Sequence, residues 1–192
     1  MARKRPIPTI FLSENTLSLE ECTLLITLYD RHSELTSRRD YNSRPLLDYY
    51  TLRGVDSKSA SLVHGITLRC KKKVEVHFGT AELFVESFFV ACLFTGDSHI
   101  PHADNERLEN GGWIPNHTPQ RDYTGIAYLN EDFTGGALVF PELDVVITPK
   151  AGLLVGFPSN HDFVHAVPEV ISGKRYSLPV WFTLNSAKAM QV

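Results

Sequence analysis

Short runs of β-branched and aromatic residues fill the chain from about residue 74 onward, and they restrict the fold more than any other feature. Gly, Pro, Asn and Asp separate the runs, so the chain turns every few residues. The runs are VEVHF, LFVESFFVACLF, YTGIAYLN, ALVF, DVVITP, GLLVGF and YSLPVWFTL. Many short strands separated by turn residues are typical of a sandwich or barrel. We therefore predict an all-β core over residues 76–185.

The part of the chain before this core has a pattern that predicts helices. Ser18 is followed by two acidic residues, as is typical of a helix start, and by an apolar stripe at helical spacing. We expect one helix over 18–34 and a second over 56–72. The polar stretch 37–48 between them is predicted to be a loop. The expected fold is mainly β with N-terminal helices, in which residues 1–75 support the core.

Length and composition limit the remaining possibilities. A chain of 192 residues suffices for one domain with a real core and is short for two, so we predict a single domain over 1–192. The net charge of −3 gives no argument for nucleic acid or an anionic membrane as a partner. No apolar run reaches the ~18 residues of a transmembrane helix, and no secretory signal is expected. The three cysteines form no CxxC pair, which favours reduced thiols and a cytoplasmic protein.

A cluster of histidine and aspartate in SHIPHADNERLENGG, residues 98–112, predicts a metal site. His102 and Asp104 are two positions apart, so on an extended segment their side chains point to the same face. A third ligand must come from a distant segment. The downstream candidates are His117, His161 and His165. We favour His165, which lies just before the last long strand, whereas His99 is expected to face away from His102 and to pack or support the site.

Two histidines and one carboxylate define a particular kind of metal centre. Three ligands on one side of the ion leave positions open on the other, which is the facial triad of non-haem Fe(II) oxygenases. A structural zinc site is closed by four protein ligands, usually including Cys, and the cysteines here lie far from the cluster. The residue types therefore favour iron and open positions for O2 and a cosubstrate.

Arg175 provides a second element of the predicted site. It follows His165 by ten residues within a β-rich run. Its planar guanidinium can bind a carboxylate with two parallel hydrogen bonds. Ser177 is two residues further on and shares a strand face with Arg175. This pair inside a barrel suits the far end of a dicarboxylate cosubstrate, whereas a surface salt bridge is the alternative for an arginine considered alone.

The combination of motifs resembles a known family. The pattern H-x-D, a YLN strand, a GG-containing strand and H-x(9)-R resembles the Fe(II)/2-oxoglutarate dioxygenases of the prolyl hydroxylase branch. PHADN at 101–105, RDYTGIAYLNEDFTGGALVF at 121–140 and WFTL at 181–184 look like the catalytic domain of the prolyl 3-hydroxylases. The resemblance covers about residues 96–185. It implies a double-stranded β-helix (jelly roll) that holds Fe(II) and 2-oxoglutarate, uses O2 as a cosubstrate and has ascorbate as a further candidate.

The resemblance also implies roles for individual residues. The positions that match the iron ligands are His102, Asp104 and His165. The positions that match contacts to 2-oxoglutarate are Arg175, Tyr128 and, with less support, Ser177. Trp181 matches an aromatic residue on the substrate side. Many relatives have a tyrosine near the position of Phe94, so that one cosubstrate contact is in doubt.

The implied reaction is hydroxylation of an unactivated C–H bond of a prolyl residue in a peptide or protein, with release of succinate and CO2. A free amino acid or another small molecule is an alternative substrate, and a non-catalytic jelly-roll binding module is the alternative from another class.

Residues 105–121 form a long Gly- and Pro-containing insertion after Asp104. Loops of this length are often lids, so Trp113 is a candidate substrate contact, with an ordinary surface loop as the alternative. The oligomeric state is left open.

Overall fold

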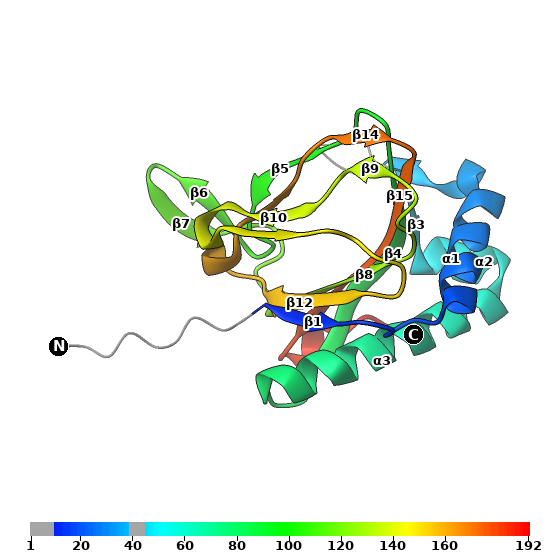
Figure 1. The fold of residues 1–192 in the computed structure, drawn as a ribbon. Coiled ribbons are helices and arrows are strands. Elements are labelled where there is room, and N and C mark those ends of the chain that lie inside the picture. Colours follow the sequence, from blue (N-terminus) through cyan, green and yellow to red (C-terminus); the bar gives the residue numbers. More distant parts are fainter. Residues whose placement is uncertain (1–9, 39–44) are drawn as a thin grey trace.

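Two β-sheets lie face to face in the computed structural model, which describes residues 10–38 and 45–192 (Figure 1). The larger sheet has seven strands in the order β1-β12-β8-β15-β4-β3-β2, and the smaller has four in the order β11-β10-β13-β5. Three helices, α1, α2 and α3, lie on the larger sheet's outer side (Figure 1). The predicted fold class, a jelly-roll core supported by helices, is confirmed.

The elements have the following bounds. The larger sheet contains β1 (Phe11–Ser13), β2 (Ser37–Arg38), β3 (Pro45–Asp48), β4 (Phe84–Phe94), β8 (Tyr123–Tyr128), β12 (Leu154–Pro158) and β15 (Lys174–Thr183). The smaller contains β5 (His99–His102), β10 (Leu138–Phe140), β11 (Val145–Ile147) and β13 (His165–Val167). Two further pairs are β6 (Glu106–Glu109) with β7 (Gly112–Pro115), and β9 (Thr134–Gly135) with β14 (Val170–Ser172). The helices are α1 (Leu19–Arg31), α2 (Tyr49–Val55) and α3 (Ser57–Phe78).

Helix α1 begins where the sequence predicts it. The Ser18 hydroxyl accepts a hydrogen bond from the Glu21 main-chain N at 3.2 Å, and the Glu21 carboxylate accepts one from the Ser18 N at 2.9 Å. This reciprocal capping box satisfies two main-chain donors that have no partner inside the helix. The helix ends at Arg31, slightly before the predicted end at residue 34.

Helix α3 is longer than predicted, and the expected strand VEVHF is wrong. Asp56 caps the start, as predicted, but the helix continues beyond residue 72 to Phe78. Val74 is fully buried and extends the apolar stripe of Ile66 and Cys70, so the same face stays on the core. A short apolar run fits a strand or a helix turn equally well, and here the preceding helix decides.

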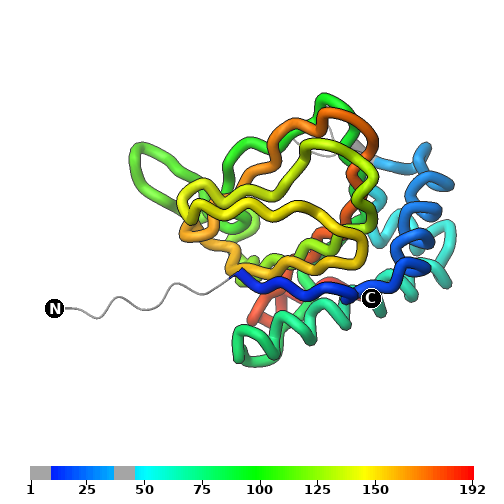
Figure 2. Tube along the Cα trace, viewed as in Figure 1, coloured from blue at the N-terminus to red at the C-terminus, as the bar shows by residue number. Residues whose placement is uncertain are grey.

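The prediction that 37–48 is a loop is wrong at both ends of that range. Residues 37–38 form β2 and residues 45–48 form β3, while 39–44 lie outside the described residues. Strand β3 pairs with β4, and β1 pairs with β12, so the first 75 residues also contribute strands to the larger sheet (Figure 2). A division into helical support and β core at residue 75 is therefore too simple.

The two faces of the larger sheet have different environments. Along β15, Tyr176 and Leu178 join the hydrophobic cluster between this sheet and the helices. Arg175 and Ser177 alternate with them and therefore face the space between the two sheets. A second cluster fills that space and includes Tyr128 from β8. The interior of the jelly roll thus receives polar side chains from a strand whose other face packs in the core from Tyr176 to Phe182.

The three cysteines lie in the interior of the protein. Cys22, Cys70 and Cys92 are buried free thiols. Burial raises the pKa of Cys70 to about 12 and that of Cys92 to about 12, so both thiols stay protonated and unreactive at neutral pH.

Among the helices of the described residues, none has the length and apolar character needed to cross a membrane.

Gly135, in strand β9, allows a test of how closely this strand lies against the main chain at Glu169. Its φ is +76°, and a Cβ placed there would lie 2.2 Å from the Glu169 main-chain O. We expect Gly135→Ala to lower the free energy of unfolding by at least ~2 kcal/mol, because a left-handed backbone and a main-chain clash both oppose the methyl group. Urea unfolding measures the change.

The matched control is Gly65→Ala in the middle of α3, where nothing lies within 4 Å of the added methyl group. That change is expected to raise stability by ~0.5–1 kcal/mol, because alanine is the better helix former. Equal effects of the two substitutions would contradict the packing described for Gly135.

Candidate metal centre

His102, Asp104 and His165 converge on one point inside the jelly roll. Their ligand atoms all lie within 4.8 Å of one another. Asp104 is placed between the two rings, with Oδ1 3.9 Å from His102 Nε2 and Oδ2 3.8 Å from His165 Nε2. Strands β5 and β13 pair with His102 directly opposite His165, so the sheet register brings the distant histidine to the H-x-D motif.

The orientation of both imidazole rings suits metal ligation through Nε2. His102 Nδ1 lies 2.8 Å from the Ile100 main-chain O, and His165 Nδ1 lies 3.1 Å from the Phe163 main-chain O. An Nδ1–H that donates to a carbonyl leaves the Nε2 lone pair free and fixes the ring. Both free Nε2 atoms face the Asp104 carboxylate. The donor set therefore fits a divalent metal ion.

Asp104 is held by a residue that the sequence reasoning missed. The Thr124 hydroxyl donates to Asp104 Oδ2 at 2.6 Å and lies 2.8 Å from the Ser159 hydroxyl. The Asp104 main-chain N donates to the Ser159 O at 3.0 Å. Thr124 and Tyr128 are four residues apart in β8 and share a face, so strand alternation could have indicated that Thr124 faces the site.

The electrostatics of the cluster favour the protonation state that metals require. Burial lowers the pKa of His165, although the nearby Asp104 opposes this shift. Burial acts to raise the pKa of Asp104, but His165, His102 and the Thr124 hydrogen bond outweigh it, and the net pKa is lowered. A neutral imidazole beside a charged carboxylate is the form in which both residues bind a metal ion.

Arg175 is buried on the same side of the sheet. Only 4% of the residue is exposed. Its Nε donates to the Gly136 main-chain O at 2.8 Å, and one Nη contacts the Tyr128 hydroxyl at 3.4 Å. Ser177 lies directly opposite Tyr128 on the neighbouring strand. Within the described part of the chain, no carboxylate forms an ion pair with this guanidinium, so a buried cation is available for an anionic ligand.

Trp181 continues the interior face of β15 beyond Ser177. It is buried, and Arg121 places its guanidinium carbon 3.9 Å from the centre of the indole ring. Arg121 also pairs with Glu86, with Nε 3.0 Å from the carboxylate. The geometry shows a stacked ion pair that fixes the Trp181 ring.

Other predicted residues have different surroundings. Phe94 is 38% exposed and faces away from the interior, whereas the adjacent Leu93 belongs to the interior cluster. The expectation that His99 faces away from His102 is wrong, because the two rings stack with centroids 5.3 Å apart. His99 therefore packs on a candidate ligand, because the β5–β13 pairing shifts register between His99 and His102 and simple strand alternation does not describe such a shift. His117 is exposed and lies outside the cluster found among the described residues.

The predicted loop at 105–121 contains an ordered hairpin. Strands β6 and β7 pair within it, with Leu108 opposite Trp113. Trp113 is 36% exposed and stacks on His161, which begins a short 3-10 helix (η3, His161–Phe163). A role of this segment as a lid remains a prediction.

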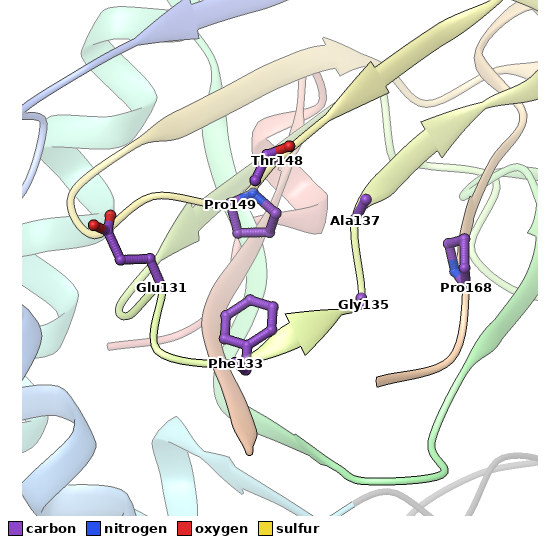
Figure 3. A pocket seen from close by; sticks show the side chains of 8 residues that line it. Glu131, Phe133, Gly135, Ala137, Thr148, Pro149 and Pro168 are labelled. Carbon is purple, nitrogen blue, oxygen red and sulfur yellow. The ribbon is translucent and has the colours of Figure 1, made fainter. Parts of the chain in front are cut away.

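A separate pocket of about 320 Å³ lies beside the loop that precedes β10 (Figure 3). Phe133, Pro149 and Pro168 give it mainly apolar walls, and none of the three candidate ligands lines it. Gly136 also lines this pocket, and its main-chain O accepts the hydrogen bond from Arg175 Nε. The pocket therefore lies beside the main-chain segment that holds Arg175 and does not include the metal cluster.

A jelly roll whose interior presents two histidines, an aspartate and a buried arginine has the architecture of a non-haem iron oxygenase. The family model for the 2OG-Fe(II) oxygenase superfamily matches residues 88–183, which include the metal cluster and Arg175. The chain belongs to the 2OG-Fe(II) oxygenase superfamily, as the motifs predict. The family uses Fe(II), 2-oxoglutarate and O2, and the His-Asp-His cluster is compatible with the iron.

Curated relatives place the chain near prolyl hydroxylases. Human prolyl 3-hydroxylase 2 is 33% identical over 150 residues, which covers 68% of this chain and 21% of the human protein. Prolyl 3-hydroxylase 1 of Gallus gallus is 32% identical over 150 residues, with 68% and 21% covered. The aligned region thus spans about a fifth of the length of these relatives.

Solved structures share the fold. A Trichoplax adhaerens prolyl hydroxylase in complex with a peptide fragment of the hypoxia inducible factor oxygen degradation domain superposes with a TM-score of 0.67 at 22% identity, covering 92% of this chain and 84% of that one. The viral collagen prolyl hydroxylase from Paramecium Bursaria Chlorella virus-1 gives 0.61 at 18% identity, with 95% and 96% covered. At these identities the likeness supports the jelly-roll fold.

Proposed function

We propose that this chain is an Fe(II)- and 2-oxoglutarate-dependent dioxygenase that hydroxylates a prolyl residue of a peptide or protein and releases succinate and CO2. The observation that carries the proposal is the convergence of His102, Asp104 and His165, with both Nε2 atoms free. Three ligands on one side of an ion leave room for a cosubstrate and O2 on the other. Membership of the oxygenase superfamily supports the same assignment.

Different side chains have different roles in the proposed reaction. His102, Asp104 and His165 would hold the iron, which together with 2-oxoglutarate and O2 supplies the oxidising power for C–H hydroxylation. Arg175 would bind the distal carboxylate of 2-oxoglutarate, because it is buried and lacks an acidic partner among the described residues. Tyr128 orients the guanidinium and, together with Ser177, offers hydroxyl groups to the same carboxylate.

The proposed substrate class rests on the relatives and on the aromatic side of the site. Proteins named prolyl 3-hydroxylases share about a third of their aligned residues with this chain, and one structural neighbour binds a peptide. Trp181 presents an aromatic ring on the interior face, held by Arg121. A rigid aromatic face packs well against the flat pyrrolidine ring of proline. Nothing in the site or the relatives favours a free amino acid substrate or a non-catalytic binding module.

The experiment is a turnover assay with paired peptides. Chain loaded with Fe(II) is incubated with 2-oxoglutarate and a library of proline-containing peptides, each matched to a copy with alanine in place of proline. We expect succinate to form with proline peptides, together with a peptide mass gain of about one oxygen atom, and neither with the alanine copies. Mass spectrometry and succinate quantification provide the readouts.

Two results would contradict the proposal in different ways. Hydroxylation of free amino acids but of no peptide would favour the small-molecule alternative. Tight metal binding without any 2-oxoglutarate turnover, with peptides or small molecules, would favour a binding module.

A further inference from the structure

The β6–β7 hairpin begins two residues after the candidate ligand Asp104. It also contacts the segment that precedes the candidate ligand His165. Its first residue, Glu106, accepts hydrogen bonds from the His161 main-chain N at 2.8 Å and from His161 Nδ1 at 2.7 Å through the same oxygen, Oε2. His161 lies four residues before His165. The carboxylate therefore joins the two chain segments that carry Asp104 and His165.

The second strand of the hairpin strengthens this connection. The Trp113 ring stacks on the His161 ring with centroids 5.4 Å apart and an interplanar angle of 13°. Glu106 and Leu108 share one face of β6, and Leu108 is directly opposite Trp113. One face of the hairpin thus supplies both a carboxylate and an aromatic ring to His161.

Main-chain hydrogen bonds continue the same connection toward the metal cluster. The Asp104 and Asn105 main-chain N atoms both donate to the Ser159 O, at 3.0 and 3.2 Å. The Asn116 side-chain amide and the Thr118 hydroxyl donate to the Asp104 main-chain O at 3.2 and 2.9 Å. Both ends of the hairpin therefore fix the main chain of a candidate ligand.

The η3 segment needs such support, because no side-chain hydrogen bond caps its N-terminus. The Glu106 carboxylate accepts from the main-chain N of His161, which supplies the missing contact. Without it, the short run between Ser159 and His165 would have fewer restraints on its position relative to Asp104.

We propose that Glu106, His161 and Trp113 form a clamp that positions Asp104 and His165 for metal binding, an inference that rests on the proposed metal site. These are positioning residues, because they act through the segments that hold the ligands. The hairpin insertion then supports the metal centre through the segments that carry its ligands, in addition to any part it plays in covering substrate. Groups that orient metal ligands typically change metal affinity by about 10–100-fold when they are removed.

The test measures Mn(II) affinity by electron paramagnetic resonance, together with thermal unfolding of the metal-free chain. We expect Glu106→Ala and His161→Phe each to raise the Kd for Mn(II) about 10-fold, with little change in the unfolding temperature. Glu106→Gln keeps an acceptor oxygen and is expected to recover part of the affinity. The matched control is Arg107→Ala, which removes an exposed ion pair with Glu109 in the same hairpin. The control is expected to bind Mn(II) like wild type.

Each alternative outcome overturns a defined part of the proposal. Unchanged Mn(II) affinity in both variants would overturn the clamp, whether or not their unfolding temperature falls. An equal loss in Arg107→Ala would also overturn it, because hairpin integrity alone would then explain the effect. Failure of wild type to bind Mn(II) or Fe(II) would overturn the proposed metal site, and the clamp with it.

Discussion

His102→Ala is expected to abolish succinate formation and to weaken Mn(II) binding by at least ~100-fold. The substitution removes one of three ligands, and direct ligands contribute at least as much to affinity as the groups that orient them. His102 is the most informative of the three because its side chain is 35% exposed, whereas those of Asp104 and His165 are each 6% exposed. The folded chain therefore tolerates its removal best. Mn(II) titration and succinate assays measure the two effects.

His99→Ala is the matched control for this prediction. His99 is in the same strand and stacks on His102, but it is not among the three residues of the metal cluster. We expect its removal to leave Mn(II) affinity within about threefold of wild type, because stacking alone orients the ring less than the Nδ1 hydrogen bond does. Equal losses in the two variants, or retained turnover in His102→Ala, would contradict the assignment of the ligand set.

Strand alternation and motif spacing predict several of the site's neighbouring residues from the sequence. The proximity of His102 and Asp104 follows from their spacing, and the shared face of Arg175 and Ser177 follows from alternation along one strand. Alternation failed at His99, because β5 advances three positions from His99 to His102 while β13 advances two, and the shifted register leaves the two rings stacked. Local patterns are reliable where the strand pairing keeps its register and lose their value where the register shifts.

Long-range pairing is what the sequence could not provide. The hydrogen bond of Thr124 to Asp104 joins strand β8 to the segment after β5, and the stacking of Arg121 on Trp181 depends on β8 and β15 being neighbours in the larger sheet. The run VEVHF belongs to helix α3 although its pattern also fits a strand, because a five-residue apolar pattern has no distinct period. Hairpin pairing within 105–121 was missed because its strands are only four residues long and largely exposed.

Arg175→Met is expected to raise the KM for 2-oxoglutarate by roughly 30- to 1000-fold, with a smaller change in kcat at saturating cosubstrate. Loss of one partner of a buried charged pair typically costs about 2–4 kcal/mol of binding free energy, which corresponds to that range. A change in KM alone is the mark of an interaction made equally in the ground and transition states. Methionine has a similar length and removes a buried charge, so the fold is expected to tolerate it.

Two further variants separate charge from geometry in this prediction. Arg175→Lys keeps the positive charge but loses the planar fork, so its KM is expected to lie between those of wild type and Arg175→Met. Tyr128→Phe removes one hydroxyl near the guanidinium and is expected to cost ~1 kcal/mol, or about fivefold in KM. Mn(II) affinity without cosubstrate is expected to stay unchanged in all three, because none of the substitutions touches a metal ligand. An unchanged KM in Arg175→Met would mean that the carboxylate binds elsewhere, and Arg121 would then be the next residue to replace.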